Sequence, residues 1–117
     1  MDPRVQGIIA LIDDDVCHVP TPNVLANLVH LSPSHFGHLF RSETGLSLTQ
    51  YLKVVRMRIA KQLLEGTFLS VKEIMIRVGC SDLSHFVREF KKAHGVTPSE
   101  YRHSHSKVML VKNNRSG

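Results

Sequence analysis

The fold is decided by a segment that occurs twice: residues 34–51 read SHFGHLFRSETGLSLTQY, and residues 84–101 read SHFVREFKKAHGVTPSEY. At an offset of 50 the two segments align without a gap, and alike residues coincide at helix-building positions. The coinciding pairs are Ser34/Ser84, His35/His85, Phe36/Phe86, Phe40/Phe90, Gly45/Gly95, Ser47/Thr97 and Tyr51/Tyr101. Upstream the offset becomes 49, so one extra residue lies in the second turn. The chain therefore contains an internal repeat.

Start and stop signals predict helices throughout the first repeat. Thr21-Pro22 and Ser32-Pro33 each combine an N-cap residue with a proline at the first helical position. The second of these helices ends at Gly45, a residue type that favours the left-handed conformation after a helix. Residues Ser47 to Gln50 form a capping box, S-x-x-Q, that opens a longer helix ending near Gly66.

The second repeat gives the same signals. Ser70 to Glu73 is another capping box, Gly79 makes the turn, and Ser81 is the expected N-cap of a helix that ends at Gly95. Thr97-Pro98 opens a last short helix. Because no alternating strand pattern persists anywhere, we predict an all-α fold of about seven helices, with two helix-turn-helix subdomains joined by a long linker helix.

The expected domain covers residues 5–102. It divides into a first helix-turn-helix subdomain (5–46), a linker helix (47–66) and a second helix-turn-helix subdomain (67–102), followed by a flexible tail at 103–117. The linker helix, about 27 Å long at 1.5 Å per residue, holds the subdomains apart. Its predicted apolar stripe is Leu48, Leu52, Val55, Ile59 and Leu63.

Charge is distributed unevenly along the chain. Residues 1–30 carry one basic and four acidic side chains, whereas residues 31–117 carry 14 basic and 6 acidic ones, a balance of +8. A polyanionic partner is therefore expected on the later part, with nucleic acid the first candidate and an anionic membrane surface the second. The two cysteines, Cys17 and Cys80, define no disulfide framework and fit a reduced, cytoplasmic setting. We expect neither a signal peptide nor a transmembrane span.

The faces of the second helix in each repeat indicate where DNA would bind. With Phe36 and Phe86 pointing to the core, the opposite faces carry small residues beside long cationic or imidazole ones. Small residues permit close approach to a major groove, and long ones reach base edges or phosphates. The recognition helices are therefore expected at about 33–44 and 82–94. The candidate DNA-binding residues are Ser34, Gly37, His38, Arg41, Ser84, Val87, Arg88, Lys91 and Lys92.

Within this set, Arg88 is the best candidate for a base contact, since arginine can bond guanine in a fork, and His38 is its equivalent in the first repeat. Arg41, Lys91 and Lys92 are expected at phosphates. Each could instead be a solvated surface charge. His35 and His85, beside the core phenylalanines, are interpreted as partly buried packing residues, and Cys80 as a small core residue.

Other classes of function have less support in the sequence. No catalytic residues, cofactor or metal site are expected, because nucleophile motifs, phosphate loops and three-ligand spacings are absent from the sequence. A membrane-surface role for residues 48–65 is disfavoured because both subdomains need the apolar stripe of that helix for burial. A helical protein-interaction module without sequence-specific DNA binding remains the main alternative.

With these elements in place, the sequence resembles the AraC/XylS family of bacterial transcription regulators. The resemblance rests on the dual unit, on Arg56 to Ala60 with Leu63-Leu64, on the run from Val78 to Lys92, and on Gly95 to Arg102. It implies recognition helices in adjacent major grooves, with Ser34, Gly37 and His38, then Ser84, Val87 and Arg88, at base-reading positions.

The resemblance also implies a transcriptional activator that contacts RNA polymerase in the cytoplasm. Family members mostly carry a separate ligand-sensing or dimerisation domain, so the chain is either a stand-alone regulator or a C-terminal piece. Three positions depart from the family pattern: Cys80 stands where Phe is usual, Met75 where Ala is usual, and His30 where Gly or a small polar residue is common. These departures bear on the target sequence rather than on the fold.

Overall fold

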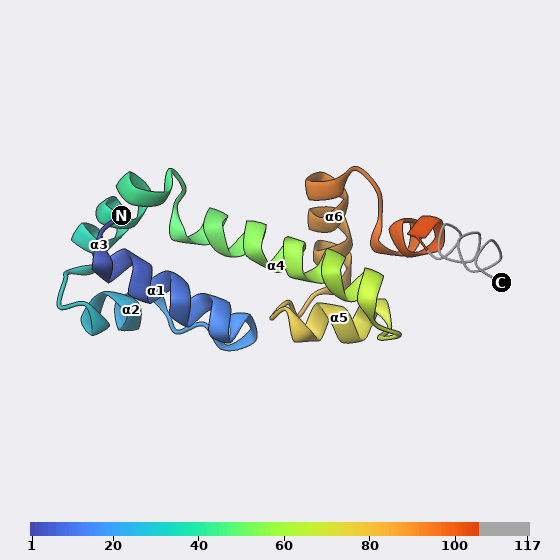
Figure 1. Cartoon of the computed structure of the whole chain (residues 1–117), viewed down its shortest axis with the longest axis horizontal. Coiled ribbons are helices and arrows are strands. Elements are labelled where there is room, and N and C mark those ends of the chain that lie inside the picture. The colour runs from blue at the N-terminus through green and yellow to red at the C-terminus, as the bar shows by residue number, and fades with distance from the viewer. Residues whose placement is uncertain (106–117) are drawn as a thin grey trace, which may run out of the picture. The chain divides into compact units, whose positions relative to one another are not determined.

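A computed structural model describes residues 1–105 of the chain, and within them every regular element is a helix. The elements are α1 (Pro3–Asp14), a 3-10 helix η1 (Val16–His18), α2 (Pro22–Leu28), α3 (Pro33–Thr44), α4 (Leu48–Gly66), α5 (Val71–Arg77) and α6 (Leu83–His94), shown in Figure 1. A further helical segment covers residues 98–105. The prediction of an all-α fold is confirmed.

The chain divides inside α4 into two compact units, Met1–Arg56 (the first unit) and Met57–Gly117 (the second unit). Each unit has its own hydrophobic core. The predicted boundaries at residues 46, 66 and 102 stay a prediction. The structure divides between Arg56 and Met57, inside the linker helix, and not at either end of that helix.

The core of the first unit is built by α1, α2 and α3, with side chains from the start of α4 packed against it. Its buried members are Val5, Ile8, Ile12, Leu25, Ala26, Phe36 and Phe40. From α4, Leu48, Tyr51 and Leu52 pack on this cluster, and the ring of Tyr51 meets Phe40 edge-on at 5.3 Å between centroids. The predicted inward direction of Phe36 and Phe40 is confirmed.

The core of the second unit is built by the later half of α4 with α5 and α6, which flank it in Figure 1. Its buried members are Met57, Ala60, Leu64, Ile74, Met75, Val78, Phe86 and Phe90. Cys80 packs against this cluster as a partly buried residue, close to its predicted role. Tyr101, from the helical segment after α6, also packs on it, with its ring 6.1 Å from that of Phe90.

Helix caps explain where most elements begin. Thr21 accepts a hydrogen bond from the Val24 amide, and Ser32 accepts one from the His35 amide, as predicted. Both capping boxes are present: the Ser47 and Gln50 pair exchange hydrogen bonds of 3.1 and 3.2 Å, and Ser70 with Glu73 forms the same arrangement.

One predicted cap is wrong. The N-cap of α6 is Asp82, and its carboxylate accepts from the His85 amide at 2.9 Å, whereas Ser81 lies one residue before that cap. The helix therefore begins at Leu83 rather than at residue 82. Both residue types cap well, so the sequence alone does not separate two adjacent candidates.

The turns of the two helix-turn-helix units differ at one position. Gly79 follows α5 with φ +89°, and its repeat counterpart His30 has φ +59°, which makes His30 a non-glycine residue in the left-handed region. Gly45 and Gly95 end α3 and α6 with φ of +80° and +85°, as predicted for C-terminal glycines. The first turn thus holds an imidazole in a conformation that glycine adopts at lower cost.

Two further expectations need correction. The predicted stripe of α4 continues as Ile59 and Leu63, which are only partly buried, whereas the fully buried side chains of its later half are Met57, Ala60 and Leu64. The predicted start of the flexible tail at residue 103 is wrong, because residues 103–105 are helical. The rest of that tail, residues 106–117, lies outside the described residues.

Candidate nucleic-acid interface

The helix α3 separates a buried face from an exposed polar one. Phe36 and Phe40 fix its inner face in the core of the first unit, with 2% and 0% exposure. The candidate residues Ser34, Gly37, His38 and Arg41 are all exposed. A Cβ atom added at Gly37 would meet no heavy atom within 4 Å, so the glycine leaves open space on this face.

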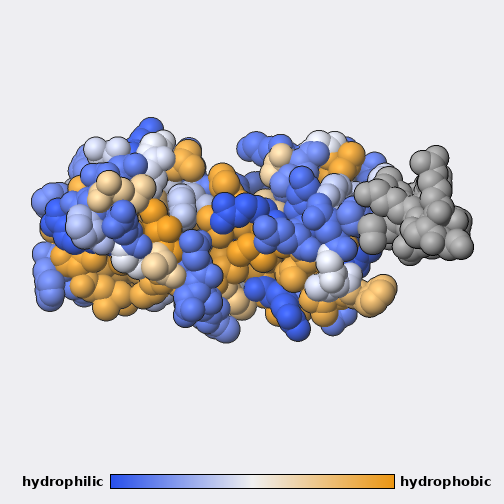
Figure 2. Space-filling model, viewed as in Figure 1, coloured by the Kyte–Doolittle hydropathy of each residue, from blue (hydrophilic) through white to orange (hydrophobic). Residues whose placement is uncertain are grey.

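The helix α6 repeats this plan with more positive charge. Phe86 and Phe90 are fully buried, and Ser84, Arg88, Lys91 and Lys92 are exposed. Val87 is partly buried, so it presents less surface than the other candidates. On the side visible in Figure 2, mostly hydrophilic residues cover α6.

The last turn of α6 carries Lys91, Lys92 and His94, where cations interact favourably with the helix dipole. Glu89 is partly buried, and its Oε1 lies 3.7 Å from Nε2 of His85 one turn earlier. The outward face of α6 is therefore dominated by Arg88, Lys91 and Lys92.

The prediction that His35 and His85 are partly buried is wrong. Both are exposed, and 55% of the His85 side chain is accessible to solvent. A helix rotates by about 100° per residue, so a side chain next to a core phenylalanine points sideways rather than inward. Both histidines therefore belong to the accessible surface of α3 and α6.

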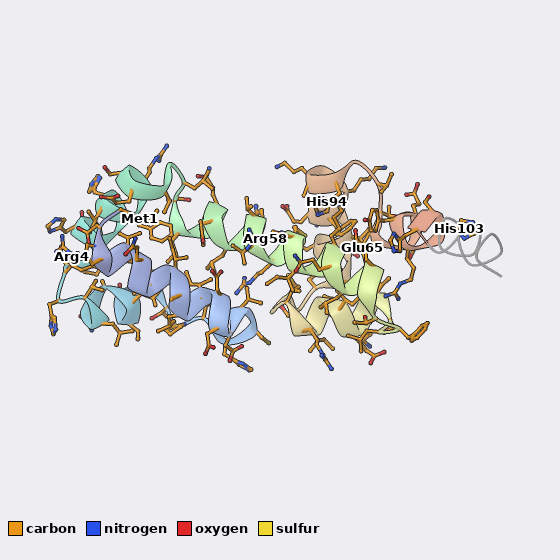
Figure 3. The ribbon with its side chains drawn as sticks, viewed as in Figure 1. Met1, Arg4, Arg58, Glu65, His94 and His103 are labelled. Carbon is orange, nitrogen blue, oxygen red and sulfur yellow. The ribbon has the colours of Figure 1, made fainter. Side chains whose placement is uncertain are left out.

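The sequence reasoning did not single out His94, which is a partly buried contact of the second unit. Its ring lies 4.5 Å from that of Phe90, and its Nε2 is 3.0 Å from the carbonyl oxygen of Met57 in α4. Figure 3 shows the labelled His94 on α6 beside α4. Since a carbonyl oxygen only accepts, Nε2 carries the proton of this hydrogen bond. The contact fixes the end of α6 against α4.

Tyr101 and Arg102, which the sequence reasoning placed only in a closing motif, hold the end of α4. The guanidinium of Arg102 donates to the carbonyl oxygens of Leu64, Thr67 and Leu69, which follow or end the last turn of α4. The Tyr101 hydroxyl donates to the Glu65 carboxylate, labelled in Figure 3. Burial, together with this hydrogen bond, raises the pKa of Tyr101 to about 12. A helical segment far along the chain therefore caps α4.

No three histidine, cysteine, aspartate or glutamate side chains in residues 1–105 come together as a metal site would require. None of the helices described is both long enough and apolar enough to cross a membrane.

Two helix-turn-helix units, the second with a basic outer helix, define the class of DNA-binding transcription regulators. A model of the helix-turn-helix domain matches residues 25–104. The arabinose operon regulatory protein of Salmonella typhimurium is 38% identical over 104 residues, which cover 87% of this chain and 37% of that protein. The chain belongs to the AraC/XylS family of helix-turn-helix transcription regulators.

Solved structures agree with this assignment. The C-terminal domain of AraT, a response regulator from Geobacillus stearothermophilus, matches with a TM-score of 0.80 and 32% identity, over 88% of this chain and 86% of that one. The DNA-binding domain of AdpA, a global transcriptional factor solved in complex with a target DNA, matches with a TM-score of 0.82 and 26% identity, over 88% and 93%. The chain spans 13%, 36% and 37% of the lengths of three curated relatives, so it corresponds to a part of each.

Proposed function

We propose that this chain binds double-stranded DNA with sequence specificity, using α3 and α6 as recognition helices in adjacent major grooves. The observation that carries the proposal is the outer face of α6, where Arg88, Lys91 and Lys92 are exposed opposite the buried Phe86 and Phe90. A helix with one face in the core and a cationic face in solvent suits insertion into a groove lined by phosphates. The solved complex of the AdpA domain with its target DNA supports the proposal by similarity.

Each candidate residue has a role in this proposal that follows from its chemistry. Arg88 reads guanine through its forked donors, with Ser84 and Val87 on the same helix near the bases. Lys91 and Lys92 neutralise phosphates. In α3, the base-reading positions are Ser34, Gly37 and His38, and Arg41 binds a phosphate. Because Gly37 has no side chain and His38 has fewer donors than arginine, the first helix contributes less sequence readout.

The remaining parts of the proposal concern the whole regulator. The chain acts as a transcriptional activator in the cytoplasm, touches RNA polymerase, and catalyses no reaction. The chain is either a stand-alone regulator or one part of a longer protein with a ligand-sensing or dimerisation domain, and two of its curated relatives are longer than the stretch that it matches. None of its described residues is assigned a metal or a cofactor.

The test begins with selection of bound sequences from random duplex DNA at a fixed, stated salt concentration. The affinity for the selected site is then measured by fluorescence anisotropy. Arg88→Ala should cost about 1–3 kcal/mol, roughly a 5- to 150-fold loss, and should relax selectivity at one base pair. Arg88→Lys keeps the charge but loses the fork, so it should relax selectivity at the same base pair with a smaller loss.

The matched control is Arg77→Ala, which removes an exposed arginine of the same unit from α5 rather than from α6. It should leave selectivity unchanged. An equal loss for Arg88→Ala on every sequence would make Arg88 a phosphate contact. Failure to enrich any sequence would overturn the proposal of sequence-specific binding.

One observation favours the alternative, a protein-interaction module. Val24 and Leu28 lie one turn apart on α2 and are 46% and 54% exposed, which leaves apolar surface on the first unit. The alternative predicts weak DNA binding without sequence preference, so the selection experiment separates the two. The cationic face of α6 leads us to prefer the DNA-binding proposal.

A further inference from the structure

The two units differ in net charge. The first unit has four basic and five acidic side chains, a net charge of −1 with neutral histidines, whereas the second unit has eleven basic and five acidic ones, a net charge of +6. A DNA duplex is attracted to cationic surfaces. The first unit therefore needs another source of positive charge if α3 is to approach DNA.

The lysine and arginine residues of the first unit supply little of that charge on α3. Arg4 is ion-paired with Asp2 at 2.9 Å, and Nη2 of Arg56 donates to the carbonyl oxygen of Val16. Lys53 lies on α4. The helix α3 itself contains one arginine, Arg41, and no lysine.

Three exposed histidines lie on α3 or in the turn before it. His35 and His38 lie on α3, and His30 lies in the turn that leads into it. Histidine is the side chain whose charge ordinarily changes between pH 5 and 8. Protonation of these three side chains would change the net charge of the first unit from −1 to +2.

The backbone of His30 gives an independent reason to assign it a function. Its φ of +59° lies in the left-handed region, and its counterpart in the second unit is Gly79. A non-glycine residue there costs about 1–2 kcal/mol. Backbone strain of this kind clusters at active sites and ligand clamps, so it motivates a functional hypothesis for His30.

A comparison of His35 with His85 gives a second reason. In α6, His85 has Glu89 one turn later, with Nε2 and Oε1 3.7 Å apart. In α3, the position that corresponds to Glu89 is Leu39. A protonated His85 therefore faces a carboxylate of its own helix, whereas a protonated His35 has no acidic residue at that position.

The other charged groups of the first unit do not engage these histidines. Among the described residues, no hydrogen bond or ion pair joins the side chain of His30, His35 or His38 to another group, and α2 has no ionisable side chain. The other ionisable groups of the first unit are Arg41 and Glu43 on α3, Arg4, Asp13 and Asp14 on α1, Tyr51, Lys53 and Arg56 on α4, and Asp2, Asp15, Cys17 and His18 outside these helices. His18 lies against Asp15, with 3.0 Å between Nδ1 and Oδ2.

We infer that His30, His35 and His38 contact DNA as protonated imidazoles, with His30 and His35 on phosphate oxygens and His38 on a base edge. The inference rests on the proposed DNA-binding function and adds His30 and His35 to the contact residues. A phosphate beside an imidazole favours its charged form. Binding of DNA is therefore coupled to uptake of protons, so the affinity for DNA falls as the pH rises.

The test measures affinity for the selected site at pH 6 and pH 8 in the same salt. The dissociation constant of the wild-type chain should rise about tenfold or more, since one linked proton accounts for roughly tenfold per pH unit above the titration range. The variant His30→Asn/His35→Gln/His38→Gln should bind more weakly at pH 6 and lose most of the pH dependence. Asparagine suits His30 because it tolerates the left-handed conformation.

His85→Gln is the matched control, because it removes a histidine from the equivalent position of α6 that faces Glu89. It should keep the pH dependence. A second variant, His35→Lys/His38→Lys, should bind tightly at pH 8 with reduced pH dependence. Circular dichroism melts verify that each variant is folded.

The outcomes separate this inference from the function on which it rests. Specific binding that is equally strong at pH 6 and pH 8, or pH dependence that survives in the triple variant, overturns the inference and leaves the proposed function standing. Absence of specific binding at both pH values overturns both.

Discussion

Replacement of Phe90 by alanine should unfold the second unit and spare the first. The Phe90 side chain has no exposure to solvent, and its ring lies 6.3 Å from Phe86, 4.5 Å from His94 and 6.1 Å from Tyr101. Truncation of a buried phenylalanine costs about 3–5 kcal/mol from lost burial and the cavity that remains. A unit of this size has a stability of about 2–7 kcal/mol at roughly 0.05–0.15 kcal/mol per residue. The loss is therefore comparable to the total.

The measurement combines urea denaturation, followed by circular dichroism, with amide hydrogen exchange. In Phe90→Ala, amides of α5 and α6 should lose protection while those of α1 to α3 keep theirs, because the first core contains no residue of the second. Phe68→Ala is the control, since the Phe68 side chain is fully exposed. It should change stability by less than about 0.5 kcal/mol. A loss below about 1 kcal/mol for Phe90→Ala, or an equal loss for both variants, would refute the core assignment.

Two smaller changes test the helix caps. Asp82→Ala should destabilise the protein by about 1 kcal/mol, because it removes the acceptor for the His85 amide in the first turn of α6. Ser81→Ala should cost only a few tenths of a kcal/mol. Thermal melts in which Ser81→Ala is the more damaging change would restore Ser81 as the cap. Hydrogen bonds from the backbone amide and hydroxyl of Ser70 hold the pKa of Glu73 below its ordinary value of 4.5. The stability linked to Glu73 is therefore present above that value and is lost as the pH falls through the lowered pKa, so Glu73→Gln should show a shallower acid-side loss in melts between pH 5 and 3; an unchanged slope would contradict this assignment.

Local signals predicted the helices well because caps act over three or four residues. Thr21, Ser32 and Ser70 each accept the amide hydrogen bond that their sequence context predicts. The ambiguity at Ser81 and Asp82 arose because two good caps are adjacent, and the choice depends on where the preceding turn ends. Sequence pattern specifies that a helix begins, and tertiary structure selects the residue.

The interface was predicted less completely because it depends on contacts between distant segments. The exposure of His35 and His85 follows from helix geometry alone, since each lies about 100° from a core phenylalanine, and a stricter use of that angle would have found it. The contact of His94 with the Met57 carbonyl has no local signal, because the two residues are 37 positions apart. The left-handed conformation of His30 was signalled by its place at a position where the family commonly has glycine or a small polar residue.

The linker helix was misread because it was treated as one amphipathic helix. It serves two cores in turn: its first half packs on the first core, and its later half belongs to the second. Spacing explains this division. The buried residues of α1 recur on α4 at an offset of 52, in the pairs Val5/Met57, Ile8/Ala60 and Ile12/Leu64. The later half of α4 therefore supplies the same buried positions to the second core that α1 supplies to the first.

This division predicts the effect of one alanine inserted between Arg56 and Met57. The hydrogen bond of Arg56 to Val16 lies wholly before the insertion, and that of His94 to Met57 wholly after it, as do the members of the two cores. Both units should therefore stay folded, with melts close to wild type. The insertion nevertheless turns the later half of α4 by about 100° and moves it about 1.5 Å relative to the earlier half.

If both recognition helices bind one duplex, this rotation should strongly weaken binding to the selected site while leaving weak non-specific binding intact. Anisotropy titrations with specific and random duplexes measure both quantities. Unfolding of either unit would contradict the division of α4 between the cores. Unchanged specific affinity in a folded insertion variant would show that the two units do not need a fixed mutual orientation, since a rotation of this size moves a base-reading side chain out of its groove.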